Sequence, residues 1–174
     1  MAVRAAEGDD DAFAALVRRH SSVLLVLACH LMGDQPDAED ALQESFLSAW
    51  RRLPEFRGDA TFRTWMYRIV TNRCLSALRS RPPPTAPLDS APEPATPTSG
   101  DLPERTAEAN AATAALTQAL TRLSAGQRAC WVLRELHGLH YDEIAHVTGT
   151  SEQAVRGKLF RARRSLAEAM SPWR

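Results

Sequence analysis

The residues with the most chemical information are a run of cations near the end of the chain. Five basic side chains fall within nine residues with no acid among them, and they are Arg156, Lys158, Arg161, Arg163 and Arg164. The apolar residues of the same stretch, at spacings of four, three and four, are Val155, Leu159, Ala162 and Leu166. This period predicts a helix with one apolar and one cationic face. A polyanion would remove the repulsion among the cations, whereas the alternative is an ordinary solvated surface helix.

The residues before this stretch predict a helix-turn-helix. Tyr141 to Thr148 has the pattern of a short helix, and Gly149 can supply the left-handed backbone of a turn. Ser151 can accept a hydrogen bond from the start of the next helix, which we expect from Glu152 to about Met170. Because such a second helix can lie in the major groove, the cationic face is predicted to contact DNA.

A proline-rich stretch divides the chain into two parts. Eight of the eleven prolines lie between Arg81 and Pro103, where they remove backbone donors and disfavour helix. We therefore expect a flexible linker over residues 82–106, between an N-terminal domain (1–81) and a C-terminal domain (107–174).

Charge is segregated along the chain, although its net charge is zero. Residues 1–50 and 82–110 carry net charges of −6 and −4, and residues 51–81 and 111–174 carry +6 and +4. The basic blocks are what a nucleic acid would attract.

Apolar periodicity and a composition poor in aromatics predict helices throughout both domains. Besides the helix-turn-helix, the expected helices run from Asp11 to Met32, Asp37 to Leu53, Thr61 to Arg79, Ala107 to Arg122 and Ala125 to Leu136. The predicted fold class is all-α, with two small helical domains joined by a Pro-rich linker.

The sequence gives no sign of a metal site, a cofactor or an enzyme. Cys29, Cys74 and Cys130 form no CxxC pair, and each is predicted to be a small core residue. No nucleophile–base set or phosphate-binding glycine loop is present. The longest apolar run, Val23 to Cys29, is too short to cross a bilayer, so we expect a soluble, cytoplasmic protein.

The chain resembles a known family along nearly its whole length. The segments from Gly138 to Ala145 and from Val155 to Arg163 resemble region 4 of the extracytoplasmic-function sigma factors of bacterial RNA polymerase. Region 2 of the same family resembles the segments Gly8 to Phe13, Asp37 to Phe46 and Phe56 to Asn72. The resemblance implies a protein that brings core polymerase to a promoter, recognises −35 and −10 elements and opens the −10 DNA. A stand-alone helix-turn-helix regulator is the alternative, but it leaves the N-terminal resemblance unexplained.

The resemblance also implies the binding residues. The helix face expected on the β′ clamp of the polymerase carries Asp40, Gln43, Glu44 and Leu47. The residues expected at the −10 DNA are Phe56, Arg57, Gly58, Asp59, Arg63, Tyr67, Arg68, Asn72 and Arg73. Of the aromatics here, we expect Tyr67 to be exposed, because the helical period places Phe62 and Trp65 in the core.

For the −35 element, the expected residues are Arg128, Ser151, Arg156, Gly157, Lys158, Phe160, Arg161, Arg163 and Arg164. Arg156, Phe160 and Arg161 are expected to contact bases, with Gly157 at the closest approach. The remaining cations are expected to bind phosphates, Arg128 from the helix before the motif. The family also implies contact with the β flap and with an anti-sigma partner. His140 stands where the family usually has Ser or Thr. Gly157 stands where the family often has Ser.

Overall fold

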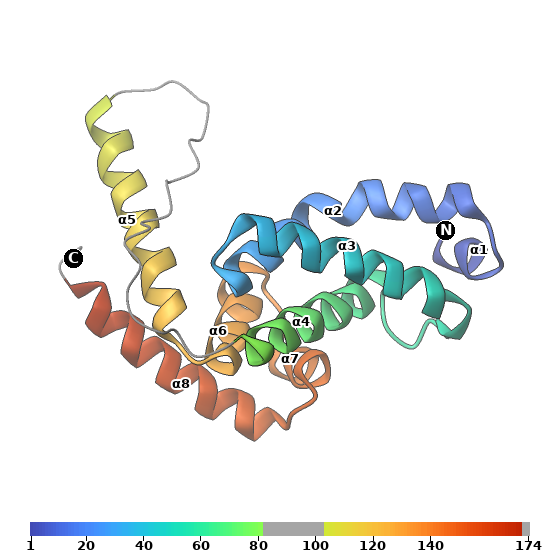
Figure 1. Cartoon of the computed structure of the whole chain (residues 1–174). Coiled ribbons are helices and arrows are strands. Elements are labelled where there is room, and N and C mark those ends of the chain that lie inside the picture. Colours follow the sequence, from blue (N-terminus) through green and yellow to red (C-terminus); the bar gives the residue numbers. More distant parts are fainter. Residues whose placement is uncertain (82–102, 172–174) are drawn as a thin grey trace.

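The computed structural model describes residues 1–81 and 103–171, and every regular element in these ranges is a helix (Figure 1). The N-terminal module (1–81) contains α1 (Ala2–Ala6), α2 (Asp10–Met32), α3 (Gln35–Arg52), the 3₁₀ turn η1 (Leu53–Glu55) and α4 (Phe62–Ser80). The C-terminal module (103–171) contains α5 (Pro103–Arg122), α6 (Ala125–Trp131), the π-helical turn η2 (Val132–Leu136), α7 (Tyr141–Thr148) and α8 (Glu152–Ala169).

The expected all-α fold class is confirmed, and the helix bounds differ from expectation mainly at N-termini. α3 begins two residues before the expected Asp37, because the Asp34 carboxylate accepts a hydrogen bond from the Asp37 N–H at 3.1 Å. α5 begins at Pro103, inside the range expected to be linker. The rest of that range, residues 82–102, lies outside the described residues. α1 was not expected from the sequence.

Helices α2, α3 and α4 pack on one another and form the core of the N-terminal module. The α2 residues Leu24, Leu27 and Leu31 are almost completely buried. On α3 the facing side chains are small, among them Ala38, Ala41 and Ala49, so the helices can approach closely. Each Cys is predicted to be in the core; Cys74 and Cys130 are buried, whereas Cys29 is partly exposed.

Helix α2 is long and apolar enough to cross a membrane by length and composition alone. The longest uninterrupted apolar run, Val23 to Cys29, gave no sign of a helix this apolar. Polar residues such as Ser21 and Ser22 interrupt the run, but the mean hydropathy of the helix stays high. In the structure one apolar side of α2 packs against α3 and α4, and 28% of the apolar window is buried.

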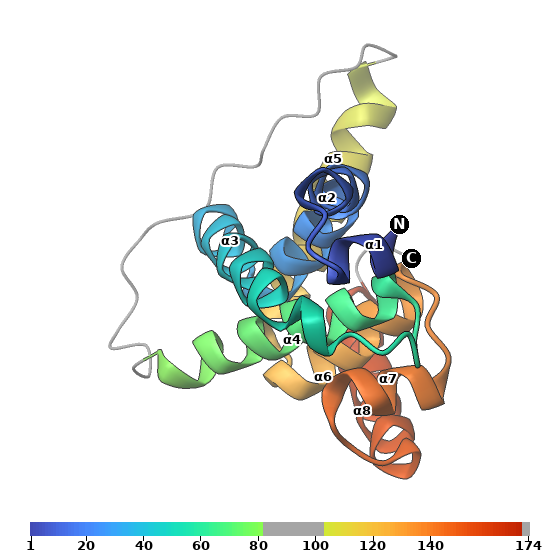
Figure 2. The ribbon, with the colours of Figure 1, turned by 90° about the vertical axis from the view of Figure 1, so that its right-hand side faces the viewer.

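The two modules pack against each other through α4. One side of α4 contacts α3 and α2, and the other side contacts α7 and α6 (Figure 2). Buried residues of both modules, such as Val70 and Cys74 on α4 and Ile144 on α7, belong to one continuous apolar cluster. The N-terminal half of α5 projects away from this body (Figure 1).

Two residues expected to contact DNA lie instead in this contact between modules. Tyr67 is only 1% exposed, so the expectation of an exposed aromatic is wrong. Its hydroxyl accepts hydrogen bonds from Arg63 at 2.9 and 3.0 Å and lies 3.1 Å from Nδ1 of His137 on the other module. The side of α4 that carries Tyr67 is covered by the C-terminal module.

Arg128 is the second such residue, and it is 6% exposed. Its guanidinium donates to the Leu31 carbonyl at the end of α2, at 2.6 Å, and to the Thr121 carbonyl at the end of α5, at 2.8 Å. Burial lowers the pKa of this guanidinium. In this arrangement Arg128 therefore joins the modules and is not available to a DNA phosphate.

Replacing Arg128 should show what this buried contact contributes. Arg128→Ala removes two charge-assisted hydrogen bonds and leaves the buried Leu31 carbonyl unpaired, which should lower the free energy of unfolding by about 2 kcal/mol. Arg122→Ala is the matched control, because Arg122 is an exposed arginine of α5. Urea unfolding measures both. Equal stability of the two variants would contradict a role for Arg128 in the contact.

His137 should make the packed state sensitive to acid. Burial, with His30 and Arg63 nearby, lowers the pKa of His137 from 6.5 to about 4. The unfolded chain therefore takes up this proton at a higher pH than the folded chain, so stability is lost as the pH falls from about 6.5 to 4. Because the ring is partly exposed and solvent screens the effect, the loss should be about 2 kcal/mol, less than the full shift would give.

A non-titrating side chain isolates this effect. His137→Gln should lose less stability between pH 7 and pH 4.5 than the wild-type chain does, as measured by thermal unfolding. His146→Gln, at an exposed position on α7, should follow the wild type. A His137→Gln profile that parallels the wild type would show that His137 is not the group responsible.

Candidate nucleic-acid interface

The turn between α7 and α8 has the geometry that the sequence predicts. Gly149 ends α7 in the left-handed region, at φ 66°, and its N–H donates to the Ala145 carbonyl. Ser151 begins α8, and its hydroxyl accepts from the Ala154 N–H at 3.2 Å. Ser151 therefore caps α8, and its side chain is exposed beside the cationic face. The predicted helix-turn-helix is confirmed.

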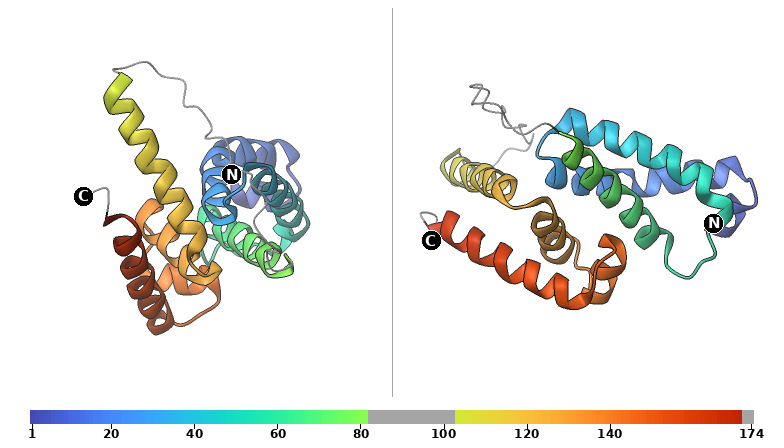
Figure 3. Two further views of the ribbon diagram at one scale, coloured as in Figure 1. Left: turned by 60° about the vertical axis from the view of Figure 1, so that its left-hand side comes forward. Right: turned by 60° about the horizontal axis from the view of Figure 1, so that its bottom comes forward.

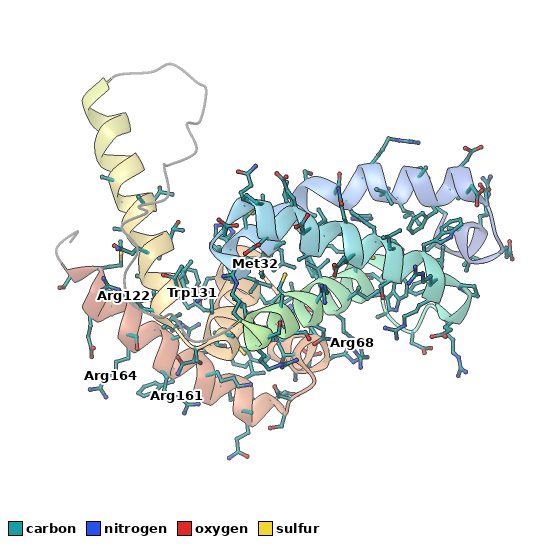
Figure 4. The ribbon with its side chains drawn as sticks, viewed as in Figure 1. Met32, Arg68, Arg122, Trp131, Arg161 and Arg164 are labelled. Atoms are coloured by element: carbon teal, nitrogen blue, oxygen red, sulfur yellow. The ribbon has the colours of Figure 1, made fainter. Side chains whose placement is uncertain are left out.

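Helix α8 divides its residues between two faces, as expected. Val155, Leu159 and Ala162 are at most 1% exposed and pack under the helix. The outward side carries exposed cations, and Arg161 and Arg164 point away from the body of the molecule (Figure 4). α8 lies along one edge of the protein with this side uncovered (Figure 3).

Phe160 is the exception on the cationic face, because it is a large apolar side chain that is 68% exposed. No ring contact of Phe160 is recorded within the described residues. An exposed aromatic ring between cations suits contact with the apolar atoms of a base.

Gly157 lies next to the side chain of Arg161. A Cβ at this position would lie 3.5 Å from Nη1 of Arg161, which is ordinary van der Waals contact. The Arg161 guanidinium therefore folds back over Gly157 in this structure. Lys158 lies partly buried against Gly126 at the start of α6, where an added Cβ would be 3.6 Å from its Cε.

Several of these cations form ion pairs with acidic side chains that lie outside the basic run. Arg163 donates to Glu135 of η2 at 2.7 Å, and this bond raises the pKa of Arg163. Arg164 pairs with Glu168 at 3.2 Å, and Arg156 lies 3.6 Å from Glu152. Among residues 1–81 and 103–171, no ion pair is recorded for Lys158 or Arg161. These pairs are exposed and weak, so a phosphate can replace them.

A second cationic surface lies on α4 and the loop before it. Arg57, Gly58 and Asp59 are exposed, and Gly58 takes a left-handed conformation at φ 78° that favours glycine. Of the α4 residues expected at the −10 DNA, the exposed ones are Arg63, Arg68, Asn72 and Arg73. Figure 4 shows Arg68 on the part of α4 near α7.

An aromatic cluster supports this loop. The Phe56 ring lies 5.2 Å from the Trp65 ring and 6.2 Å from the Phe62 ring, measured between centroids. Phe62 is buried and Trp65 is partly buried, in agreement with the core positions expected for them. Phe56 thus fixes the beginning of the loop rather than standing free, while Arg57 to Asp59 remain open to a ligand.

The face of α3 expected to bind polymerase is exposed. Asp40, Gln43 and Leu47 are open to solvent, and Leu47 is 58% exposed. Glu44 forms an ion pair with Arg73 of α4, so two residues expected in different surfaces contact each other. The cleft between α3 and α4 that contains this pair is also lined by Asp37, Asp40 and Arg81.

Sequence reasoning missed Trp50, which extends this surface. Trp50 is 40% exposed and follows Leu47 by three residues, so the two share one side of α3. Its ring lies 4.8 Å from the Phe13 ring of α2. The three-residue spacing of Leu47 and Trp50 would have indicated that both lie on the same exposed side of the helix. Within the part of the chain that the structure describes, no group of three or more His, Cys, Asp or Glu side chains could hold a metal ion.

Family models match both modules. The model described as Sigma-70 region 2 matches residues 16–82, and the model described as Sigma-70, region 4 matches residues 113–166. The chain is 35% identical over 178 residues to the RNA polymerase sigma-H factor of Pseudomonas aeruginosa, with 97% of this chain and 91% of that protein covered. It is 38% identical over 164 residues to the ECF RNA polymerase sigma factor SigM of Mycobacterium tuberculosis, with 94% and 79% covered.

Solved structures agree. CnrH in complex with the cytosolic domain of CnrY is similar with a TM-score of 0.72 and 30% identity, over 98% of this chain and 95% of that chain. The sigma factor RpoE of Bartonella quintana, in complex with the anti-sigma factor NepR, shares the fold with a TM-score of 0.72 at 24% identity, over 91% and 96%. With both regions matched in order on one chain, this protein belongs to the sigma-70 family of RNA polymerase sigma factors, as an extracytoplasmic-function member.

Proposed function

We propose that this chain binds core RNA polymerase and directs it to promoters, with α8 on the −35 element and α4 with its preceding loop on the −10 element. Family membership supports the activity. The assignment of the surfaces rests on α8. Its outward face carries exposed cations and an exposed phenylalanine, and its opposite side is apolar and buried. The polymerase, and not this chain, carries out phosphoryl transfer.

The side chains on α8 suit the major groove. An arginine can donate two parallel hydrogen bonds to O6 and N7 of guanine, which suits Arg156 and Arg161. Phe160 can contact the methyl group of thymine, which requires the exposed position that it has. Lys158, Arg163 and Arg164 lie toward the edges of this face and are assigned to phosphates, which fix the register of the helix.

The loop and α4 suit an opened strand. A base that leaves the stack needs a pocket, and the single strand needs cations along its backbone. The exposed loop Arg57 to Asp59, held by the packing of Phe56, is our candidate for the pocket. Arg63, Arg68 and Asn72 are the side chains that would follow the strand.

The packed arrangement of the modules cannot serve both promoter elements at once. Positions −35 and −10 are 25 base pairs apart, which is roughly 85 Å of B-form DNA at 3.4 Å per pair. In the structure α4 contacts α7 and α7 contacts α8, and two helix spacings amount to about 20 Å. The modules must therefore separate on the promoter, and weak DNA binding by the free chain follows.

The polymerase surface is assigned to α3. Its acidic residues Asp40 and Glu44 suit a basic partner, and Leu47 with Trp50 adds apolar area at the centre. We assign this face to the β′ clamp and the C-terminal module to the β flap. A cytoplasmic location follows from these partners. Because CnrH and RpoE are described in complexes with CnrY and NepR, we also propose an anti-sigma partner here.

Transcription with purified core polymerase tests the −35 assignment. The promoter is obtained by sequencing the DNA that the chain binds together with core enzyme. Arg156→Ala or Arg161→Ala should lower run-off transcription about 10-fold or more, because each removes base contacts worth roughly 1–3 kcal/mol. Transcript yields unchanged in both variants would contradict the assignment of α8.

Arg19→Ala is the control, because Arg19 is an exposed arginine of α2 outside all three proposed surfaces. It should leave transcription unchanged. A stand-alone regulator would instead bind its site tightly without polymerase, and the same DNA measured without core enzyme separates the two functions.

Polymerase binding has its own matched pair of variants. Leu47→Glu places a charge at the centre of the proposed α3 surface and should weaken co-purification with core polymerase by about 10-fold. Val26→Glu places the same charge on α2, where Val26 is 48% exposed, and should have no effect. If both variants bound core polymerase equally, the polymerase surface would have to lie elsewhere.

A further inference from the structure

Tyr141 lies among three arginines at the point where α7 begins. The guanidinium carbon of Arg134 is 5.2 Å from the centroid of the Tyr141 ring, and that of Arg156 is 5.8 Å from it. Interaction with Tyr141 also raises the pKa of the third arginine, Arg163, after the larger effect of Glu135. Two of these arginines, Arg156 and Arg163, belong to the cationic face of α8.

The local structure fixes the ring in this place. Gly138 turns the chain at φ 70°, and Arg134 donates to the Leu139 carbonyl at 2.8 Å, which ties η2 to the residues before α7. The Glu143 carboxylate accepts a hydrogen bond from the His140 N–H at 2.8 Å, which caps the N-terminus of α7. Tyr141 itself is partly buried and packs against the apolar core. The ring is thus held more firmly than the arginines around it.

An aromatic ring can place a cation without neutralising it. The face of the ring is electron-rich and attracts a guanidinium, yet leaves its N–H groups free for other acceptors. A carboxylate in the same place would compete with the DNA for those N–H groups, as Glu152 does weakly at 3.6 Å from Arg156. The ring also opposes the mutual repulsion of Arg134 and Arg156. It can therefore hold Arg156 on the α8 surface before DNA arrives.

We propose that Tyr141 is a positioning residue for −35 recognition, which places Arg156 over its ring for contact with the DNA. The proposal rests on the proposed function, because it takes Arg156 to be a DNA contact. Tyr141 itself need not touch a base. It acts by reducing the number of conformations that Arg156 loses on binding.

Fluorinated rings at position 141 test this with almost no change of shape. Full-length chains carrying phenylalanine, monofluorophenylalanine or trifluorophenylalanine in place of Tyr141 are combined with core polymerase on the promoter fragment obtained as above. Fluorine removes electron density from the ring face, so affinity for the promoter should fall with each step, by about two- to fivefold across the series. Equal affinity across the series would overturn the proposal.

A double-variant comparison separates positioning from a structural role. Tyr141→Leu should weaken promoter binding two- to fivefold in the wild-type chain and have no further effect when Arg156→Ala is already present. An equal loss in both backgrounds would show that Tyr141 only supports the fold. If Tyr141→Leu does not fold, as judged by circular dichroism, the fluorinated series decides alone.

The same variants distinguish failure of the proposal from failure of the proposed function. If Arg156→Ala alone leaves promoter binding unchanged, then Arg156 does not contact the −35 element and both fall. If Arg156→Ala weakens binding but the ring substitutions do not, only the role of Tyr141 is overturned. His146→Leu, at an exposed position of the same helix α7, is the control and should bind as the wild type does.

Discussion

The packing of α7 against α4 is the contact on which the rest of the arrangement depends. It joins the apolar residues of two modules into one cluster and covers one side of the helix that carries the proposed −10 residues. Arg128 and the pair Tyr67–His137 supply polar contacts at its border. What the contact leaves exposed is equally informative, because the cationic sides of α4 and α8 and the acidic side of α3 all remain open. The chain thus keeps its proposed binding surfaces available while their spacing is wrong for a promoter.

Each helix at these surfaces has a buried side that packs in the core and an exposed side that is proposed to bind a partner. α8 buries Val155, Leu159 and Ala162 while it exposes arginines, and α3 buries alanines while it exposes Asp40 and Leu47. The exposed pairs between Arg163 and Glu135, and between Arg73 and Glu44, add little stability in water. They satisfy the cations of the free chain at low cost and can be exchanged for phosphates.

Local patterns were sufficient for most of the helices and for the helix-turn-helix. The period of α8, the turn at Gly149 and the cap at Ser151 are each visible within a few residues, so the sequence shows them directly. The burial of Tyr67 and Arg128 is different in kind. Their partners, His137 and Leu31, are 70 and 97 residues away, and no local period reports such a contact. The contacts of the Tyr141 ring were not expected for a related reason, because they join residues of η2, α7 and α8.

The distance between the two modules, measured in the free chain and on a promoter, shows whether they separate. Spin labels on cysteines introduced at Ser22 of α2 and Ser165 of α8, both exposed, are read by pulsed electron resonance in a chain with Cys29 replaced by Ala. We expect one short distance in the free chain and an increase of tens of ångströms, of the order set by 25 base pairs, in the complex with core polymerase and promoter. An unchanged distance in that complex would contradict the separation of the modules and the assignment of α8 and α4 to two distant promoter elements.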